Sequence, residues 1–211
     1  MLDFAEVRQE KQTLADLARD LSAADLHRLT DEMVDTVLAI IAEATAADVV
    51  FVPEDPSAND TFGASEEASL AWTLGHVIVH ATASSEEGAA LSSELARGVE
   101  ITGRSRYETE WGTVHGVAQL RQRLEESRRM RHAFLDTWPT EPHLDVVYDP
   151  GGGLAKYGPM NAIGRFLLGL MHEDSHLEQM REIMRQAHEG PLALAVPRKS
   201  RLSGLLPFLR K

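Results

Sequence analysis

Four long segments of this sequence repeat their apolar residues at three- and four-residue steps, the period of a helix that buries one face. They run over about residues 14–41, 66–91, 114–138 and 161–188. Strands have almost no support, because the short apolar run VVFV is ended at once by Pro53. We therefore predict an all-α four-helix bundle, in which the polar stretch from about Arg97 to Trp111 is one long crossover.

Local signals place the helix starts and the buried faces within these segments. Ser22 and Thr30 are predicted N-caps, since their side-chain oxygens can accept the first free backbone N–H groups of a helix. The third segment should bury five apolar residues and carry its arginines outside; the five are Val117, Leu120, Leu124, Met130 and Phe134. The fourth segment is apolar nearly all round until Met171, so it should lie at the centre of the bundle.

Composition and charge limit the partners of this chain. One bundle domain is expected over residues 1–189, followed by a basic tail, 190–211, that makes an accessory contact with an acidic surface of the same chain or a partner. A net charge of −12 argues against nucleic acid. No apolar run approaches the roughly 18 residues of a membrane span, and no secretory signal begins the chain. We expect a cytoplasmic protein without a membrane partner, and homodimer formation stays open.

Histidine is the residue type that points to chemistry, because the chain has no cysteine and a metal would need His, Asp or Glu. Two pairs, His76 with His80 and His172 with His176, have the i, i+4 spacing that places two imidazoles on one helix face. Helical winding turns His172 and His176 inward, beside Gln179. His80 lies at the edge of an apolar stripe, and His76 roughly 40° further toward solvent.

These directions make His80, His172 and His176 the candidate ligands of one divalent metal ion. Three imidazoles leave at least one coordination position for water or substrate, so the predicted site is open. A single histidine that points inward is often only a hydrogen-bonded core residue. Three histidines that point toward one place make metal binding the better interpretation. His76 is expected to be solvated or to support a ligand. No catalytic residue is singled out.

Glu173 and Asp174 are further candidates for supporting residues, because they flank the ligands in the block HEDSH. Either carboxylate could orient the N–H group of a ligand imidazole. The alternative is an ion pair on the helix surface with a neighbouring arginine.

Two motifs resemble those of the DinB-like (YfiT-like) proteins. AWTLGHVIVH, residues 71–80, resembles the tryptophan-to-histidine segment that opens their second helix, and HEDSH, residues 172–176, resembles their second histidine motif. The resemblance covers most of the chain, from the loop before Trp72 to about His188. It implies an up-down-down-up four-helix bundle in which His80, His172 and His176 bind a divalent transition metal, zinc or nickel.

The same resemblance implies a transferase or isomerase that uses a low-molecular-weight thiol, such as mycothiol or bacillithiol, and a small electrophile. The sequence departs from the family pattern at His76, where an acidic residue is common, in a longer N-terminal portion and in the basic tail. These departures concern the substrate and not the metal.

Two other functions compete with this interpretation. HEDSH also satisfies His-Glu-x-x-His, the metallohydrolase motif in which the glutamate, here Glu173, is the general base. Gln179 stands where the extended form of that motif needs glycine, and no active-site edge strand is evident. The other alternative is a bundle that binds a metal or ligand without catalysis, which a fourth protein ligand would favour.

Overall fold

The computed structural model describes residues 2–56, 58 and 69–189, and within these ranges the regular structure is helical. The α-helices are α1 (Ala5–Arg8), α2 (Leu14–Ala18), α3 (Ala23–Ile40), α4 (Ala46–Val49), α5 (Leu74–Ala96), α6 (Val117–Asp136), α7 (Ala162–Ser175) and α8 (Leu177–Glu189). Two 3₁₀ turns, η1 (Trp111–Thr113) and η2 (Gly152–Tyr157), lie in the loops. The described residues contain only an isolated antiparallel bridge between Tyr148 and Met160 and no strand at VVFV. The prediction of an all-α protein is confirmed.

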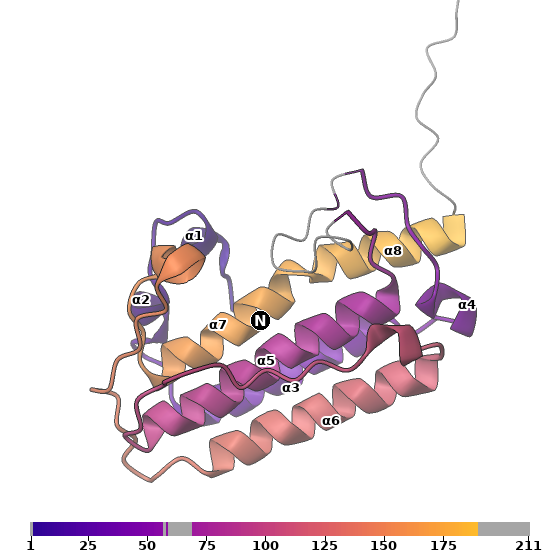
Figure 1. The fold of residues 1–211 in the computed structure, drawn as a ribbon. Helices are drawn as coiled ribbons and strands as arrows, with labels where there is room; N and C mark the ends of the chain where they lie inside the picture. Colours follow the sequence, from indigo (N-terminus) through magenta and orange to yellow (C-terminus); the bar gives the residue numbers. More distant parts are fainter. Residues whose placement is uncertain (1, 57, 59–68, 190–211) are drawn as a thin grey trace, which may run out of the picture.

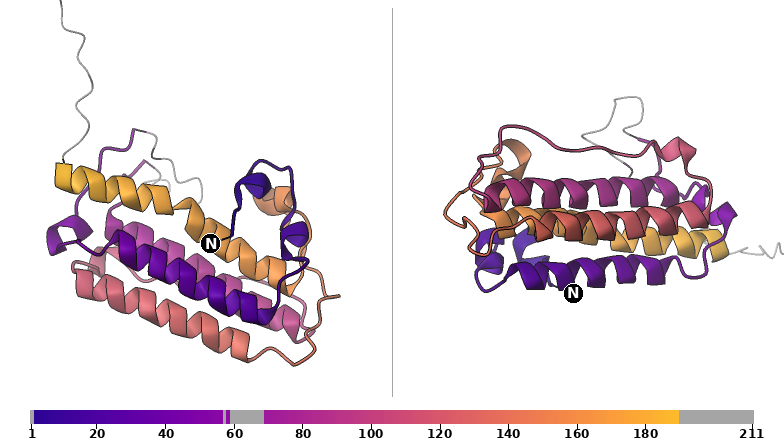
Figure 2. Two further views of the ribbon diagram at one scale, coloured as in Figure 1. Left: turned by 180° about the vertical axis from the view of Figure 1, so that it is seen from behind. Right: turned by 90° about the horizontal axis from the view of Figure 1, so that it is seen from below.

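Four long helical rods lie side by side in Figure 1: α3, α5, α6 and the pair α7–α8. Helix α5 packs against α6 and α7, and α3 packs against α6, α7 and α8. The segment that joins α5 to α6 runs back along α5, as the right-hand view of Figure 2 shows. Among the described residues no helix is both long and apolar enough to cross a membrane. The predicted tail, 190–211, lies outside the described residues.

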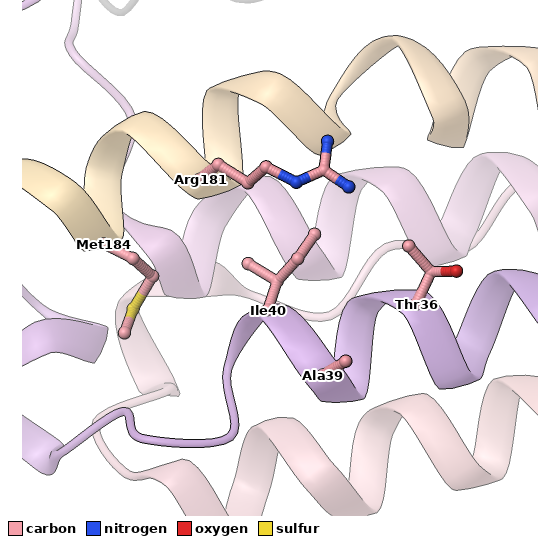
Figure 3. Close-up of a pocket in the computed structure, with 5 residues that line it drawn as sticks. All are labelled: Thr36, Ala39, Ile40, Arg181 and Met184. Carbon is pink, nitrogen blue, oxygen red and sulfur yellow. The ribbon is translucent and has the colours of Figure 1, made fainter.

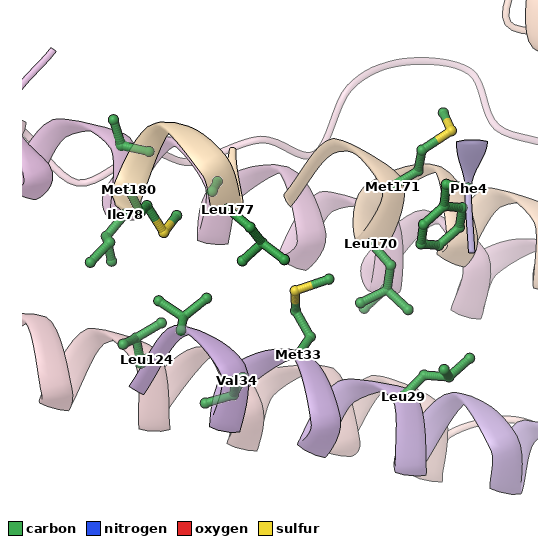
Figure 4. Close-up of a cluster of buried hydrophobic side chains, with 14 of the residues drawn as sticks. Phe4, Leu29, Met33, Val34, Ile78, Leu124, Leu170, Met171, Leu177 and Met180 are labelled. Atoms are coloured by element: carbon green, nitrogen blue, oxygen red, sulfur yellow. The ribbon is translucent and has the colours of Figure 1, made fainter. Parts of the chain in front are cut away.

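The apolar core fills the space between these rods. Figure 4 shows side chains of α3 opposite those of α7 and α8. Buried members of this cluster include Leu29, Met33, Val34, Ile78, Leu124, Leu170, Leu177 and Met180. Helix α7 is buried from Ala162 to Met171, as expected for the central helix.

Two of the predicted helix starts differ from the structure. Ser22 does cap α3, because its Oγ accepts from the backbone N–H of Asp25, but the prediction for Thr30 is wrong, since Thr30 lies buried inside α3. Helix α5 begins at Leu74 and not near residue 66, because the Thr73 Oγ1 accepts from the backbone N–H of His76 and ends the preceding loop. Residues 59–68 lie outside the described residues.

The fourth predicted helix is two helices, α7 and α8, that meet at His176. No proline lies at this point. The Ser175 Oγ donates a hydrogen bond of 2.5 Å to the carbonyl oxygen of His172, a side-chain contact that competes with the backbone ladder and bends helices. The chain direction therefore changes at a predicted ligand.

The backbones of α5 and α7 meet at two glycines. A Cβ atom added to Gly169 would lie 3.0 Å from the carbonyl oxygen of Ser84 and 3.0 Å from the Cα of Ser85. A Cβ added to Gly88 would lie 3.1 Å from the Cα of Gly169. No side chain fits between the helices here, so this contact fixes their separation close to His80 and His172.

Gly169→Val is expected to lower the free energy of unfolding by about 1–3 kcal/mol, because the new side chain must push α7 away from α5. Chemical denaturation with urea measures this change. Gly103→Val is the matched control, since a Cβ there meets no atom within 4 Å, and it should change stability by about 0.5 kcal/mol or less. Equal stabilities of the two variants would contradict a tight α5–α7 contact.

Candidate metal centre

The structure brings the three predicted ligands together. His80 comes from α5, His172 from the last turn of α7, and His176 from the junction of α7 and α8. One ring nitrogen of each lies within 4.8 Å of the other two, and all three side chains are half-buried. The Nε2 atoms of His80 and His172 are 3.3 Å apart.

This arrangement fits a divalent transition metal. Two nitrogens that bind one tetrahedral ion at about 2.0–2.1 Å must lie about 3.4 Å apart, close to the separation of the His80 and His172 Nε2 atoms. Burial and the neighbouring His176 and His80 lower the pKa of His172 to about 3. The His172 imidazole is therefore neutral at physiological pH, which is the form that binds metal.

Neighbouring side chains hold two of the imidazoles in a ligand orientation. The Nδ1 of His176 lies 2.8 Å from Gln179 Oε1, so a protonated Nδ1 donates there and Nε2 keeps its lone pair. The Nδ1 of His80 lies 3.4 Å from a carboxylate oxygen of Glu108. A carboxylate behind a histidine is the usual way to orient a metal-binding imidazole.

Arg106 holds Glu108 in place. Its guanidinium pairs with the Glu108 carboxylate and donates to the backbone carbonyl of His80. The Arg106 Nη2 also lies 3.2 Å from the His80 Nδ1. The two N–H groups of Nη2 already donate to the Glu108 carboxylate and to the His80 carbonyl. We therefore assign the proton to the His80 Nδ1, which donates it to Glu108. Burial raises the pKa of Glu108, yet hydrogen bonds from His80 and Arg106 outweigh it and lower this pKa to about 2.

The prediction that His76 is solvated is wrong, whereas its alternative role in supporting a ligand stays a prediction. Its side chain is buried and lies between two indole rings, with ring centroids 4.3 Å from Trp72 and 4.8 Å from Trp111. The winding of α5 alone pointed it toward solvent, but Trp111 of the crossover covers that face. His76 is therefore part of an aromatic wall and not one of the three converging ligands.

Glu173 does not orient an imidazole and is not on the helix surface. It is fully buried, pairs with Arg131 of α6 at 2.8 Å, and accepts a hydrogen bond of 2.6 Å from Ser85 Oγ. Arg131 was expected outside but is also fully buried. The predicted inner face of α6 is otherwise largely as expected, since Leu120 and Leu124 are buried and Val117 and Phe134 pack against the core. The buried residues of α6 are Leu120, Leu124, Ser127, Arg131 and Leu135.

Asp174 forms an ion pair with Arg8 of α1 and contacts no ligand ring in the described structure.

A cavity of about 1130 Å³ adjoins the three histidines, and Trp72 and Trp111 line it beside them. Such a volume accommodates a small-molecule ligand. A separate pocket of about 490 Å³ lies between α3 and α8, as Figure 3 shows, and its polar lining side chains are Thr36 and Arg181. None of the residues that line that pocket is His, Asp or Glu, so the candidate metal site belongs to the larger cavity.

Glu173→Gln is expected to lower the free energy of unfolding by about 3–5 kcal/mol, because it leaves the buried Arg131 charge without its partner. Replacing both residues, as Arg131→Met with Glu173→Gln, should recover most of this loss. Asp174→Asn, which removes a more exposed pair, should cost about 1 kcal/mol or less. Urea unfolding of the four proteins measures this difference, and equal costs for Glu173 and Asp174 would refute a structural role for the buried pair.

The comparison with family models agrees with the motifs. The model of the DinB superfamily matches residues 6–180, a span that includes His80, His172 and His176. No curated protein and no solved structure matches the chain. Because the family match covers most of the sequence and both histidine motifs, the chain belongs to the DinB superfamily.

Proposed function

We propose that this chain is a divalent-metal-dependent transferase that activates a low-molecular-weight thiol, mycothiol or bacillithiol, toward a small electrophile. The observation that carries the proposal is the convergence of three imidazole nitrogens beside a cavity of about 1130 Å³. Zinc or nickel is the proposed ion. When bound, such an ion would lower the pKa of a thiol and stabilise the thiolate.

The residues of the chain have separate roles in this proposal. His80, His172 and His176 bind the ion as neutral donors, while Glu108 and Gln179 hold two of the rings in place. The aromatic wall of Trp72, His76 and Trp111 limits the access of water. Since the chain has no cysteine, the thiol must be an external molecule.

The helix arrangement supports the proposal. Near one end of α5, Gly75 lies close to the Val114 backbone before α6, and near the other end Ser93 hydrogen-bonds to Thr137 after α6, so α5 and α6 run in the same direction. We propose that α3, α5, α6 and α7–α8 form the up-down-down-up bundle of DinB-like proteins. The metal site then lies between its second and fourth helices.

The competing functions have less support. A general base must reach metal-bound water, but Glu173 is fully buried against Arg131 and Ser85, which disfavours the His-Glu-x-x-His hydrolase. A closed, non-catalytic site would need a fourth protein ligand. In the described part of the chain the donor group contains the three histidines alone, which favours an open site.

Purified protein is expected to contain about one transition-metal ion per chain, and the double variant His80→Ala, His172→Ala should lose nearly all of it. Elemental analysis of both proteins measures the content. His115→Ala is the control, because His115 is exposed and should leave the metal content unchanged. Undiminished metal in the double variant would show that the ligand assignment is wrong.

Metal-loaded protein is expected to consume mycothiol or bacillithiol in the presence of one or more members of a panel of electrophiles. Glu173→Gln that retains its metal should lose at most about one to two orders of magnitude in rate, because Glu173 acts only through the packing of α7. The assay follows free thiol and, in parallel, cleavage of a generic peptide. Thiol-independent peptide cleavage that disappears in Glu173→Gln would instead establish the hydrolase. Silence with every thiol would favour the non-enzymatic bundle.

A further inference from the structure

The cavity extends well beyond the three histidines, along the groove between α5 and α7. Its lining residues on α5 follow one face from His76 to Leu91, and those on α7 follow one face from Ser175 back to Arg165. Arg165 and His172 are seven residues apart on α7, which is roughly 10 Å along a helix axis. A ligand at the histidines therefore has room to reach a second end of the cavity.

Arg165 is the distinctive residue at that second end. Its side chain is buried, with 7% of the residue surface exposed, and it lines the cavity. Within the part of the chain that the structure describes, its Nε has no hydrogen-bond partner and no carboxylate forms an ion pair with its guanidinium. Burial lowers the pKa of this guanidinium, although the charge of Glu87 opposes the shift.

The nearby carboxylate of Glu87 is already occupied. Arg104 donates to its two oxygens over 3.0 and 2.7 Å, and the backbone N–H of Ser105 donates to it over 3.2 Å. The other cavity arginines, Arg8 and Arg106, also form ion pairs. Arg165 is thus the lining cation that the described side chains leave unpaired.

A buried cation that no carboxylate contacts directly destabilises a folded chain, and Glu87, which is held by Arg104, acts on Arg165 only at a distance. A bound anion supplies the missing charge. The guanidinium is a planar fork of donors that matches the two oxygens of a carboxylate. Tyr148 and Tyr157, which line the same cavity, add phenol groups that can hydrogen-bond to such an anion.

We propose that Arg165 binds a carboxylate of a small, elongated substrate whose other end lies at the three histidines. One unpaired cation matches a singly charged carboxylate better than a doubly charged phosphate. The position of the reacting end rests on the proposed function, whereas the carboxylate site does not depend on thiol chemistry.

Four probes of similar length separate the two ends of the cavity: 8-mercaptooctanoate, 8-mercaptooctanol, octanoate and octanol. Their dissociation constants are measured by calorimetry with zinc-loaded protein. We expect each carboxylate to bind about tenfold to a hundredfold more tightly than the matching alcohol, the effect of one hydrogen-bonded charge. In Arg165→Met this preference should disappear, while the alcohols keep their affinity.

Two further variants sharpen the test. Arg165→Lys keeps the charge without the planar fork and should retain an intermediate preference. Lys156→Met removes an exposed cation of the neighbouring loop that does not line the cavity, and it should keep the full preference. The proposal would be overturned if wild-type protein bound carboxylates no better than alcohols, a result that does not depend on the folding of Arg165→Met. It would also be overturned if Arg165→Met folded and still preferred carboxylates. Loss of the thiol contribution alone would contradict the proposed function and leave the carboxylate site standing.

Discussion

The close contact between the backbones of α5 and α7 is the constraint on which the site depends. Imidazoles are short, so two helices can place ring nitrogens 3.3 Å apart only where their axes come close together. Gly88 and Gly169 allow this approach because neither carries a Cβ atom. His172 lies one turn from Gly169, so the distance between α5 and α7 at the glycines also determines the distance between His80 and His172.

The rotation of α7 about its own axis is fixed by a different interaction. Glu173 follows His172 and points about 100° away from it, into a buried pair with Arg131 and a hydrogen bond from Ser85. A buried pair of this kind adds little net stability but resists any change that separates its charges. Glu173 thereby acts as an anchor to α6, and His172, about 100° further round the helix, is directed toward His80.

The sequence predicts the convergence of the three histidines well, because helical periodicity shows in which direction each side chain points from its helix. His80, His172 and His176 come from two such segments, and local spacing was enough to find them. Glu108 was missed because it lies in the crossover, where no periodic pattern relates it to His80. His76 was misplaced for the same reason, since Trp111 covers it from a segment distant in sequence. The bend at His176 depends on a hydrogen bond of Ser175, and the spacing of the apolar residues does not change there, so the pattern could not predict it.

The placement of both candidate binding groups on one helix has a consequence for selectivity. His172 and Arg165 belong to the unbroken α7, so the distance between the metal end and the cationic end cannot adjust to the ligand. A molecule that is too short can satisfy one end only, and a molecule without negative charge leaves the buried Arg165 unpaired. Length and charge would then be selected together, by a helix whose own position is set by two glycines and one buried ion pair.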